Sequence, residues 1–556
     1  MLQRDAMRLV LSVVIITLFE VSYAQLWPYQ ILPPFPVLEG CREVLSLLGV
    51  NRGKEGLSTA THSTAYASAA AAATPKTTTT SSTETLFPEF ETWLETQQNA
   101  SFHAILQNIN PEGVIVASPS QKEPNYYYQW IRDSAITVRT LISFLEDEHI
   151  NKVSASHLHS QVINLIESYV INNYQLQRTP NKSGGFNDLL GLAEPKFNVD
   201  MTAFNEPWGR PQRDGPGLRA ATIIQFLDYL NQTGNLVNHP ELQNSAYIYQ
   251  EIVKPDLRYI CQFWNETGFD LWEEVDSIHF FTSMVQLKAL QMGIKWSRYF
   301  NDENGEFATQ LRDSFNALKQ HIQKDFGFVT SASNHVIESP HLLESGERLG
   351  LDIATILAVI YTHENDEKEQ RTESSASETI PFNVLNSYVL SSLSGLIIDM
   401  RDRYPINNNR FDGVALGRYP EDIYNGVGTS EGNPWFIATS TASEFIYQFI
   451  YNLQHQKLNL VIDDTNRQFF LPLINVTGNK YILEYNSSEY NLLIEKLLKY
   501  ADSFLDVVRT HTDSQGRMSE QFNKNTGYMQ GAKELTWSYS AVWNAIRWRR
   551  RAFFAI

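Results

Sequence analysis

Repeated helical periodicity is the feature that most constrains the fold of this chain. From about Leu86 onward, apolar residues recur at the spacing of one face of an α-helix. No short-period repeat of the kind found in solenoids is visible between these runs. Long polar and aromatic loops separate them, which predicts an all-α domain over residues 86–556, a helical toroid or barrel with its functional loops at one end. The runs are Ala135–Leu145, Val162–Tyr174, Leu218–Leu230, Phe281–Phe300, Phe307–Ile322, Ile353–Tyr361, Val384–Met400, Ser440–Leu453, Leu492–Val508 and Leu535–Ala552.

The first 85 residues differ in composition from the helical region. Arg4 and Arg8 precede a short apolar run, and Ser22-Tyr23-Ala24 offers a cleavage site, so residues 1–24 are predicted to be a cleaved signal peptide. The run is too short to favour a membrane anchor. Residues 25–57 form an N-terminal segment to which no role is assigned. Residues 58–85 are dominated by Ala, Ser and Thr, which predicts a flexible linker open to O-glycosylation.

The glycosylation triplets fit a secretory route, as does the predicted signal peptide. We therefore expect secretion to the medium or cell wall, with the vacuole as the open alternative. Because the chain has only Cys41 and Cys261, at most one disulfide can form, and two free thiols are expected. Asn-x-Ser/Thr triplets, which a secretory protein can carry as N-glycans, occur at Asn99, Asn181, Asn231, Asn265, Asn475 and Asn486.

The charge balance narrows the class of partner. The formal net charge of −18 disfavours nucleic acids and anionic membranes, which require clustered Lys and Arg. With 12% aromatic residues, the chain is better suited to neutral substrates. After signal cleavage we expect no membrane association, and a monomer.

Segments rich in chemistry lie in the loops between the helical runs. They bring carboxylates, arginines and tryptophans together, and aromatic rings beside polar groups suit the apolar face and hydroxyl rim of a sugar. Each segment alone is equally typical of a structural loop, but together they indicate a neutral-carbohydrate site. The segments are Tyr126–Asp133, Trp208–Pro216, Gly268–Val275, Leu416–Asp422 with Gly432–Trp435, and Met518–Phe522 with Leu535–Tyr539.

The segment Gly268–Val275 is the densest of these, with Asp270, Glu273 and Glu274 around a tryptophan. Crowding carboxylates among aromatic rings raises a pKa, and a carboxyl that stays protonated can act as a general acid. Two such carboxyl groups indicate glycoside hydrolysis. Metal-ligand spacings of His and Cys, the calcium-binding loop and the serine-hydrolase and kinase motifs are missing, so neither a metal nor a cofactor is predicted.

Taken in order, the loop segments resemble the glucoamylases of glycoside hydrolase family 15, closest to the yeast type, over roughly residues 86–556. The resemblance rests on Asp-Leu-Trp-Glu-Glu-Val at 270–275, Trp-Gly-Arg-Pro-Gln-x-Asp-Gly-Pro at 208–216 and Leu-Gly-Arg-Tyr-Pro-Glu-Asp at 416–422. It implies an (α/α)6 barrel with a pocket at the loop end. It also implies an exo-acting, inverting enzyme that releases β-D-glucose from starch, glycogen and maltooligosaccharides, cutting α-1,4 links faster than α-1,6 links.

The resemblance also assigns roles to individual residues. Glu273 matches the general acid, Glu520 the general base and Asp270 a supporting catalytic carboxylate. On this assignment Glu273 is protonated and Glu520 stays ionised, with the two carboxyl groups about 6.5–9.5 Å apart. The residues that match substrate-binding positions are Arg132 and Asp133 on the terminal glucose, Glu274 and Arg418 on the glucose past the cleavage point, Tyr126, Trp208 and Trp537 as aromatic walls, and Arg210 beside them.

Two alternatives remain open from the sequence. The chain can be another exo-α-glucosidase or a trehalase-like hydrolase built on the same barrel. It can also be a catalytically inactive glycan-binding protein of the cell surface.

Overall fold

The computed structural model describes residues 88–151, 157–300, 305–364, 378–410, 412–476, 478 and 480–555. The predicted signal peptide, the segment 25–57 and the linker 58–85 lie outside the described residues, as does Cys41. Cys261 is a free thiol. None of the described helices combines the length and the apolarity needed to cross a membrane.

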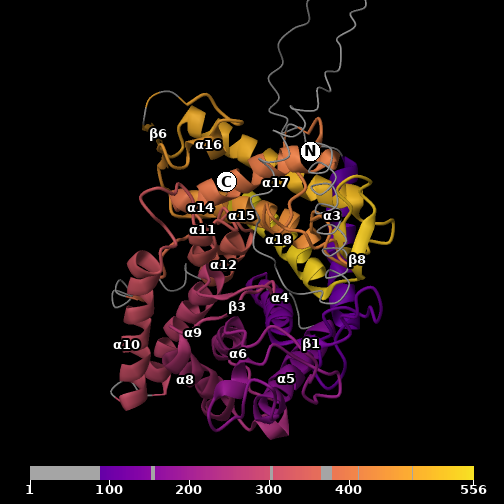
Figure 1. Ribbon diagram of the computed structural model, residues 1–556, viewed down its shortest axis with the longest axis vertical. Helices are drawn as coiled ribbons and strands as arrows, with labels where there is room; N and C mark the ends of the chain where they lie inside the picture. Colours follow the sequence, from indigo (N-terminus) through magenta and orange to yellow (C-terminus); the bar gives the residue numbers. More distant parts are fainter. Residues whose placement is uncertain are drawn as a thin grey trace, which may run out of the picture. The chain divides into compact units, whose positions relative to one another are not determined.

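An inner ring of helices forms the centre of the described domain. Each helix of this ring packs against the next, and the last packs against the first. In Figure 1, α4, α6 and α9 lie in the lower half of the molecule and α15 and α18 in the upper half. These helices are covered on nearly all sides, so polar side chains are buried in them as well as apolar ones, and every residue of α12 is buried. The ring consists of α4 (Ile131–Ile150), α6 (Asp214–Thr233), α9 (Phe280–Tyr299), α12 (Ala354–His363), α15 (Phe436–His455) and α18 (Thr536–Ala555).

An outer set of helices surrounds this ring, each packed mainly against one inner helix. Outer helices bury one face only; in α10 the buried positions Phe307, Leu311, Phe315 and Leu318 recur at the helical period. Two concentric sets of helices confirm the predicted all-α class. The outer helices are α3 (Pro88–Gln107) on α18, α5 (His157–Arg178) on α4, α8 (Lys254–Phe263) on α6, α10 (Glu306–Gln320) on α9, α14 (Ser387–Arg403) on α12, and α17 (Ser488–His511) on α15.

Each predicted helical run overlaps one of these helices, with ends that differ by a few residues. The sequence missed α3 and α8, because both bury polar side chains. Gln97 and Gln98 are buried in α3, and the buried Asp256 of α8 pairs with Arg219. Polar residues at these positions interrupt the apolar pattern on which the prediction rests.

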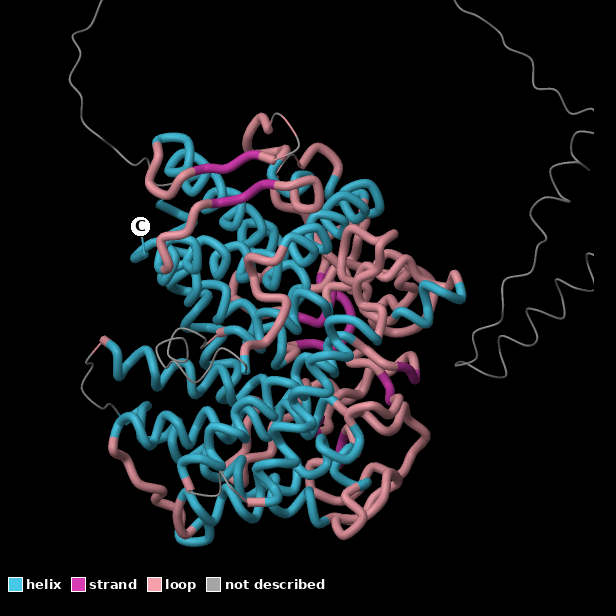
Figure 2. The backbone as a smooth tube through the Cα atoms, turned by 90° about the vertical axis from the view of Figure 1, so that its left-hand side faces the viewer, coloured by secondary structure: helices cyan, strands magenta, loops and turns pink. Residues whose placement is uncertain are grey.

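Short elements complete the domain. The strands form isolated antiparallel pairs, and Figure 2 shows them as brief segments among helices and long loops, many of which gather on the right-hand side of that view. The pairs are β1 (Gln129–Trp130) with β2 (Lys196–Phe197), β3 (Gly268–Phe269) with β4 (Asp276–Ser277), β5 (Leu460–Ile462) with β6 (Tyr481–Leu483), and β7 (Ser519–Phe522) with β8 (Met529–Lys533). The short helices are α7 (Ser245–Ile248), α11 (Pro340–Ser345), α16 (Arg467–Phe470), the 3₁₀ turns η1 (Leu190–Ala193), η2 (Pro240–Leu242) and η6 (Pro405–Asn407), and the π-helical turns η3 (Tyr249–Val253) and η4 (His321–Asp325).

Candidate active site

The loops that precede the ring helices meet one another, and the predicted site residues lie in them. Arg132 and Asp133 open α4, Asp214 opens α6, and the segment 268–277 precedes α9. Hydrogen bonds join these loops across the ring, so residues far apart in sequence share one cluster. The N-terminal ends of the ring helices therefore carry the candidate site.

The β3–β4 pair forms a tight hairpin over residues 268–277, which we call the acid hairpin. Asp270 is buried, and its Oδ1 accepts hydrogen bonds from the backbone N–H groups of Glu274 (2.7 Å) and Val275 (3.0 Å). Glu273 has a φ of +69°, an unfavourable conformation for a residue with a side chain. A Cβ on Gly209 would lie 3.0 Å from the Glu273 carbonyl oxygen, so only glycine allows this close approach. Asp270 therefore holds the turn that presents Glu273.

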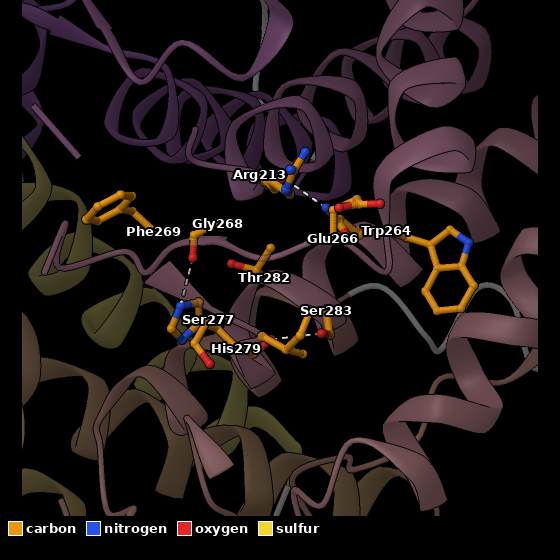
Figure 3. A pocket seen from close by; sticks show the side chains of 11 residues that line it. Arg213, Trp264, Glu266, Gly268, Phe269, Ser277, His279, Thr282 and Ser283 are labelled. Atoms are coloured by element: carbon orange, nitrogen blue, oxygen red, sulfur yellow. Dashed lines mark hydrogen bonds between the residues drawn. The ribbon is translucent and has the colours of Figure 1, made fainter. Parts of the chain in front are cut away.

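His279 holds the acid hairpin through contacts with its backbone carbonyl oxygens. Its Nε2 lies 3.0 Å from both the Gly268 and the Val275 carbonyl oxygens, and its Nδ1 lies 2.7 Å from the Ser339 hydroxyl. Burial lowers the pKa of His279, so a neutral ring donating from Nε2 fits these contacts. Figure 3 shows a small pocket beside it, between the acid hairpin and α9. Gly268 and Phe269 of the acid hairpin line this pocket, but none of the residues predicted to be catalytic or substrate-binding does.

Glu273 has different surroundings at its two carboxyl oxygens. Oε1 accepts from Trp130 Nε1 (2.6 Å) and Gln212 Nε2 (2.9 Å), and Arg132 Nη2 lies 3.5 Å away. Among the described residues, Oε2 has no hydrogen-bond partner, and the side chain is 16% exposed. Oε2 is therefore the oxygen of Glu273 that remains available to a bound molecule.

Arg132 connects Glu273 with two aspartates. Its Nη1 donates to Asp214 (3.0 Å) and to Gln212 Oε1 (2.9 Å), and its Nε lies 3.6 Å from Asp133. Burial raises the pKa of Asp133 to about 6, even though Arg132 opposes the shift. The predicted Arg132–Asp133 pair thus lies beside the candidate acid.

Glu274 is held by two arginines, although it follows Glu273 directly. Arg418 Nη2 donates to its Oε1 (2.7 Å), while Arg348 Nη2 (2.8 Å) and the Tyr419 hydroxyl donate to its Oε2. Burial opposes ionisation, but Arg418 and Arg348 outweigh it and lower the pKa of Glu274. The side chain is 28% exposed, so an ionised carboxylate faces outward here.

Glu520 lies on β7 and is only 1% exposed. Burial raises its pKa to about 8, although Arg418 opposes the shift. Burial thus opposes the predicted ionisation of Glu520, and the attraction of the arginine does not outweigh it. Gly531 makes room for this side chain, since a Cβ at 531 would lie 2.4 Å from Glu520 Oε2.

The Tyr126 hydroxyl links the two candidate catalytic carboxyls. It lies 3.0 Å from the Tyr424 hydroxyl, and the Tyr126 ring packs edge-on against Trp130 at 5.4 Å. The pKa of Tyr126 is raised mainly by burial, and charges on both Glu520 and Glu273 raise it further. Glu520 and Glu273 are therefore both close enough to Tyr126 for their charges to affect this phenol.

A model of the glycosyl hydrolases family 15 matches residues 96–547. The chain belongs to this family. It is 41% identical over 490 residues to a glucoamylase of Saccharomycopsis fibuligera, covering 83% of this chain and 91% of the relative. It is 39% identical over 488 residues to the intracellular, sporulation-specific glucoamylase of Saccharomyces cerevisiae, covering 83% of this chain and 84% of that one.

Solved structures of family 15 share the fold. The glucoamylase of Saccharomycopsis fibuligera superimposes with a TM-score of 0.77 at 39% identity, covering 84% of this chain and 97% of that one. The family 15 glucoamylase of Hypocrea jecorina gives a TM-score of 0.71 at 30% identity, covering 83% of this chain and 72% of that one. Together with the closed inner ring and its paired outer helices, these matches confirm the predicted (α/α)6 barrel.

Part of the aromatic group of this family 15 site lies around the buried Lys196, namely Tyr128, Trp130, Phe204 and Trp208. Trp208 packs edge-on against Trp130 at 6.2 Å, and Lys196 Nζ lies 3.2 Å from the centre of the Trp208 ring. Lys196 is 2% exposed, and burial lowers its pKa to about 7. A second pair of rings is formed by Trp537 and Trp272, which stack with ring centres 6.3 Å apart. Trp537 Nε1 also donates to the Tyr361 hydroxyl at 2.9 Å.

Arg210 lies behind this aromatic group. Its Nε donates to Glu194 (2.7 Å), and its two other nitrogens donate to the carbonyl oxygens of Glu206 (3.0 Å) and Phe204 (2.9 Å). Each guanidinium nitrogen is thus bonded within the protein. The geometry gives Arg210 a part in holding the loop that carries Trp208.

Three residues of the cluster escaped the sequence reasoning. Gln212 lies inside a recognised motif, which could have indicated it. Lys196 and Arg348 lie outside all five segments, and no pattern in the sequence marks them. Only the packing of separate loops reveals their position.

Proposed function

We propose that this chain is a glucoamylase: an exo-acting, inverting hydrolase that releases β-D-glucose from the non-reducing ends of starch, glycogen and maltooligosaccharides. The observation that carries the proposal is the pair Glu273 and Glu520, two carboxyls of one cluster that both influence Tyr126. The relatives named glucoamylase support the same activity. Cleavage of α-1,4 links is expected to exceed that of α-1,6 links.

In the proposed reaction, Glu273 Oε2 gives its proton to the oxygen of the glycosidic bond as that bond breaks. Water attacks the anomeric carbon from the opposite face and passes a proton to Glu520. This mechanism predicts carboxyl groups about 6.5–9.5 Å apart, with room for the water. A water that donates a hydrogen bond to Glu520 favours its ionised form, which offsets the effect of burial on its pKa.

The remaining residues are proposed to bind the two sugars on either side of the broken bond. Arg132 and Asp133 take hydroxyls that are free only at a chain end, which explains exo action. Trp208, Tyr126 and Trp537 provide walls for the terminal glucose. Glu274 and Arg418 bind the leaving sugar. Asp270 is proposed to act in support, through its hydrogen bonds to the turn beside Glu273.

We also propose that the protein is a secreted, N-glycosylated monomer that acts on soluble glucans and binds neither nucleic acid nor membrane. The predicted signal peptide, residues 1–24, and the glycosylation triplets support secretion. N-terminal sequencing of active protein from the culture medium tests this, and activity confined to the vacuole would contradict it.

Incubation with maltose, maltoheptaose and trehalose, with the anomers followed by NMR, tests the function. We expect β-glucose as the first product of both maltooligosaccharides. Initial α-glucose would contradict inversion. Hydrolysis of trehalose alone would favour the trehalase-like alternative, and binding of the glucans without hydrolysis would favour the inactive glycan-binding protein.

A further inference from the structure

One of the loops that precede the ring helices contains none of the five segments predicted from the sequence. The five recognised segments precede or open five of the ring helices, namely α4, α6, α9, α15 and α18. The remaining ring helix, α12, is preceded by the loop that contains Arg348 and Asp352. Since the other five loops all contribute residues to the site, we expect this sixth loop to contribute a functional residue as well.

Arg348 reaches from this sixth loop to Glu274. Its Nη2 donates to Glu274 Oε2 at 2.8 Å and lies 3.0 Å from the Tyr419 hydroxyl, and its guanidinium carbon lies 3.8 Å from the centre of the Tyr419 ring. The neighbouring backbone N–H of Leu349 donates to Glu421 at 2.9 Å. The loop before α12 is thereby attached to the loop before α15.

The two arginines on Glu274 are not equivalent. Arg418 is 3% exposed and is paired a second time, with Asp422 at 2.6 Å. Arg348 is 15% exposed, and among the described residues Glu274 is the only carboxylate within ion-pair distance of it. Arg418 is thus committed to the protein interior, whereas Arg348 lies on the more exposed side of the carboxylate.

We propose that Arg348 determines specificity for the leaving sugar of the glucan. It orients the Glu274 carboxylate and presents guanidinium N–H groups to the hydroxyls of the sugar past the cleavage point. A planar guanidinium has five N–H donors, and only Nη2 is engaged among the described residues. This inference rests on the proposed function and adds a residue to it.

A leaving group without hydroxyls separates this role from a structural one. Maltose and p-nitrophenyl α-D-glucoside offer the same terminal glucose, but only maltose has a second sugar for Arg348 and Glu274 to bind. We expect Arg348→Met to lower kcat/KM for maltose about 10- to 100-fold, the loss of a charge-assisted hydrogen bond. The value for the aryl glucoside should change by less than about threefold. Arg348→Lys, which keeps the charge but loses the planar fork, should lie between Arg348→Met and wild type.

Arg178 provides a matched control. It also stacks on a tyrosine, 3.6 Å from the Tyr174 ring centre, and pairs with a glutamate, Glu251, at 3.4 Å, but it belongs to the outer helix α5. Arg178→Met should leave the ratio of the two kcat/KM values unchanged.

The possible results distinguish a failure of the proposed function from a failure of the inference about Arg348. If wild type releases glucose from neither substrate, the proposed function fails. If wild type is active but Arg348→Met lowers both values in parallel, or lowers neither, the inference about Arg348 fails and the proposed function stands. Where Arg348→Met does not fold, a parallel loss in Arg348→Lys overturns the inference equally.

Discussion

The acid hairpin and the β7–β8 strand pair each supply one candidate catalytic carboxyl, in opposite surroundings. On the hairpin, N–H donors surround one oxygen of Glu273 and leave the other oxygen without a described partner. On β7, Glu520 is almost fully buried, with a pKa of about 8. The sequence predicted a raised pKa among the carboxylates of the hairpin, and there burial raises the pKa of Asp270. Burial by distant segments, and not the neighbours in sequence, decides how strongly a carboxyl holds its proton.

The largest expected effect is the loss of kcat when either candidate catalytic carboxyl, Glu273 or Glu520, is removed. Glu273→Gln and Glu520→Gln keep the size of the side chain but cannot donate or accept the proton in the same way. Each should lower kcat on maltose about 10²- to 10⁴-fold, measured by glucose release. Glu444→Gln is the control, because Glu444 is also buried but lies within α15, away from the site. Unchanged activity in Glu520→Gln would contradict its role as the base.

The next largest effect on kcat is expected from a substitution in the β7–β8 pair that fills the space beside Glu520. Gly531→Ala introduces a Cβ that would lie 2.4 Å from Glu520 Oε2, so the carboxyl must move. A displacement of this size lowers kcat by up to about 10²-fold. Gly234→Ala is the matched control, because its φ of +70° resembles the +77° of Gly531 while nothing lies within 4 Å of the added Cβ. Equal kcat values for the two variants would show that the room beside Glu520 does not matter.

On the hairpin side, Gln212→Leu should lower kcat about tenfold. The variant removes the donor to Glu273 Oε1 and the acceptor of Arg132, and a lost hydrogen bond to a charged group has about this effect. Gln286→Leu removes another buried glutamine, which donates to the Arg213 carbonyl oxygen and does not touch Glu273. If both variants lose activity to the same degree, the effect is one of stability and not of orientation.

The smallest expected effect is on Tm, and it concerns the buried carboxyl of Glu444, which lies away from the site. Burial, with the nearby charge of Glu364 adding to it, raises the pKa of Glu444 to about 8 from its ordinary 4.5. Because the folded pKa is raised, the stabilisation is fully present below about pH 4.5 and is lost as the pH rises through about 8. The Tm of wild type should therefore fall over this range, and Glu444→Gln should reduce the fall by about 2–4 °C. The exposed Glu241→Gln should leave the slope unchanged, and an identical slope in Glu444→Gln would contradict this account.

The sequence predicted most of the helices from their apolar faces and missed two, α3 and α8, that bury polar side chains. The runs at Phe307–Ile322 and Leu492–Val508 are helical as expected, whereas α8 was missed because Asp256 is buried against Arg219. For the site, the motifs predicted Glu273, Glu274, Arg132 and Arg418 as neighbours, and the structure brings them together. Asp270 and Arg210 were predicted near the site, but Asp270 Oδ1 and all three guanidinium nitrogens of Arg210 are bonded within the protein.

The sequence by itself determined the helical class, the family and the loops that hold the carboxylates, because apolar period and motif are local properties of the chain. Only the tertiary structure decided which oxygen of Glu273 is free, that Glu520 is buried, and that Arg348 meets Glu274. These depend on the closure of the helical ring, which brings together loops separated by up to hundreds of residues. Desolvation and ion pairing are set by whatever packs there, and no local pattern in the sequence records it.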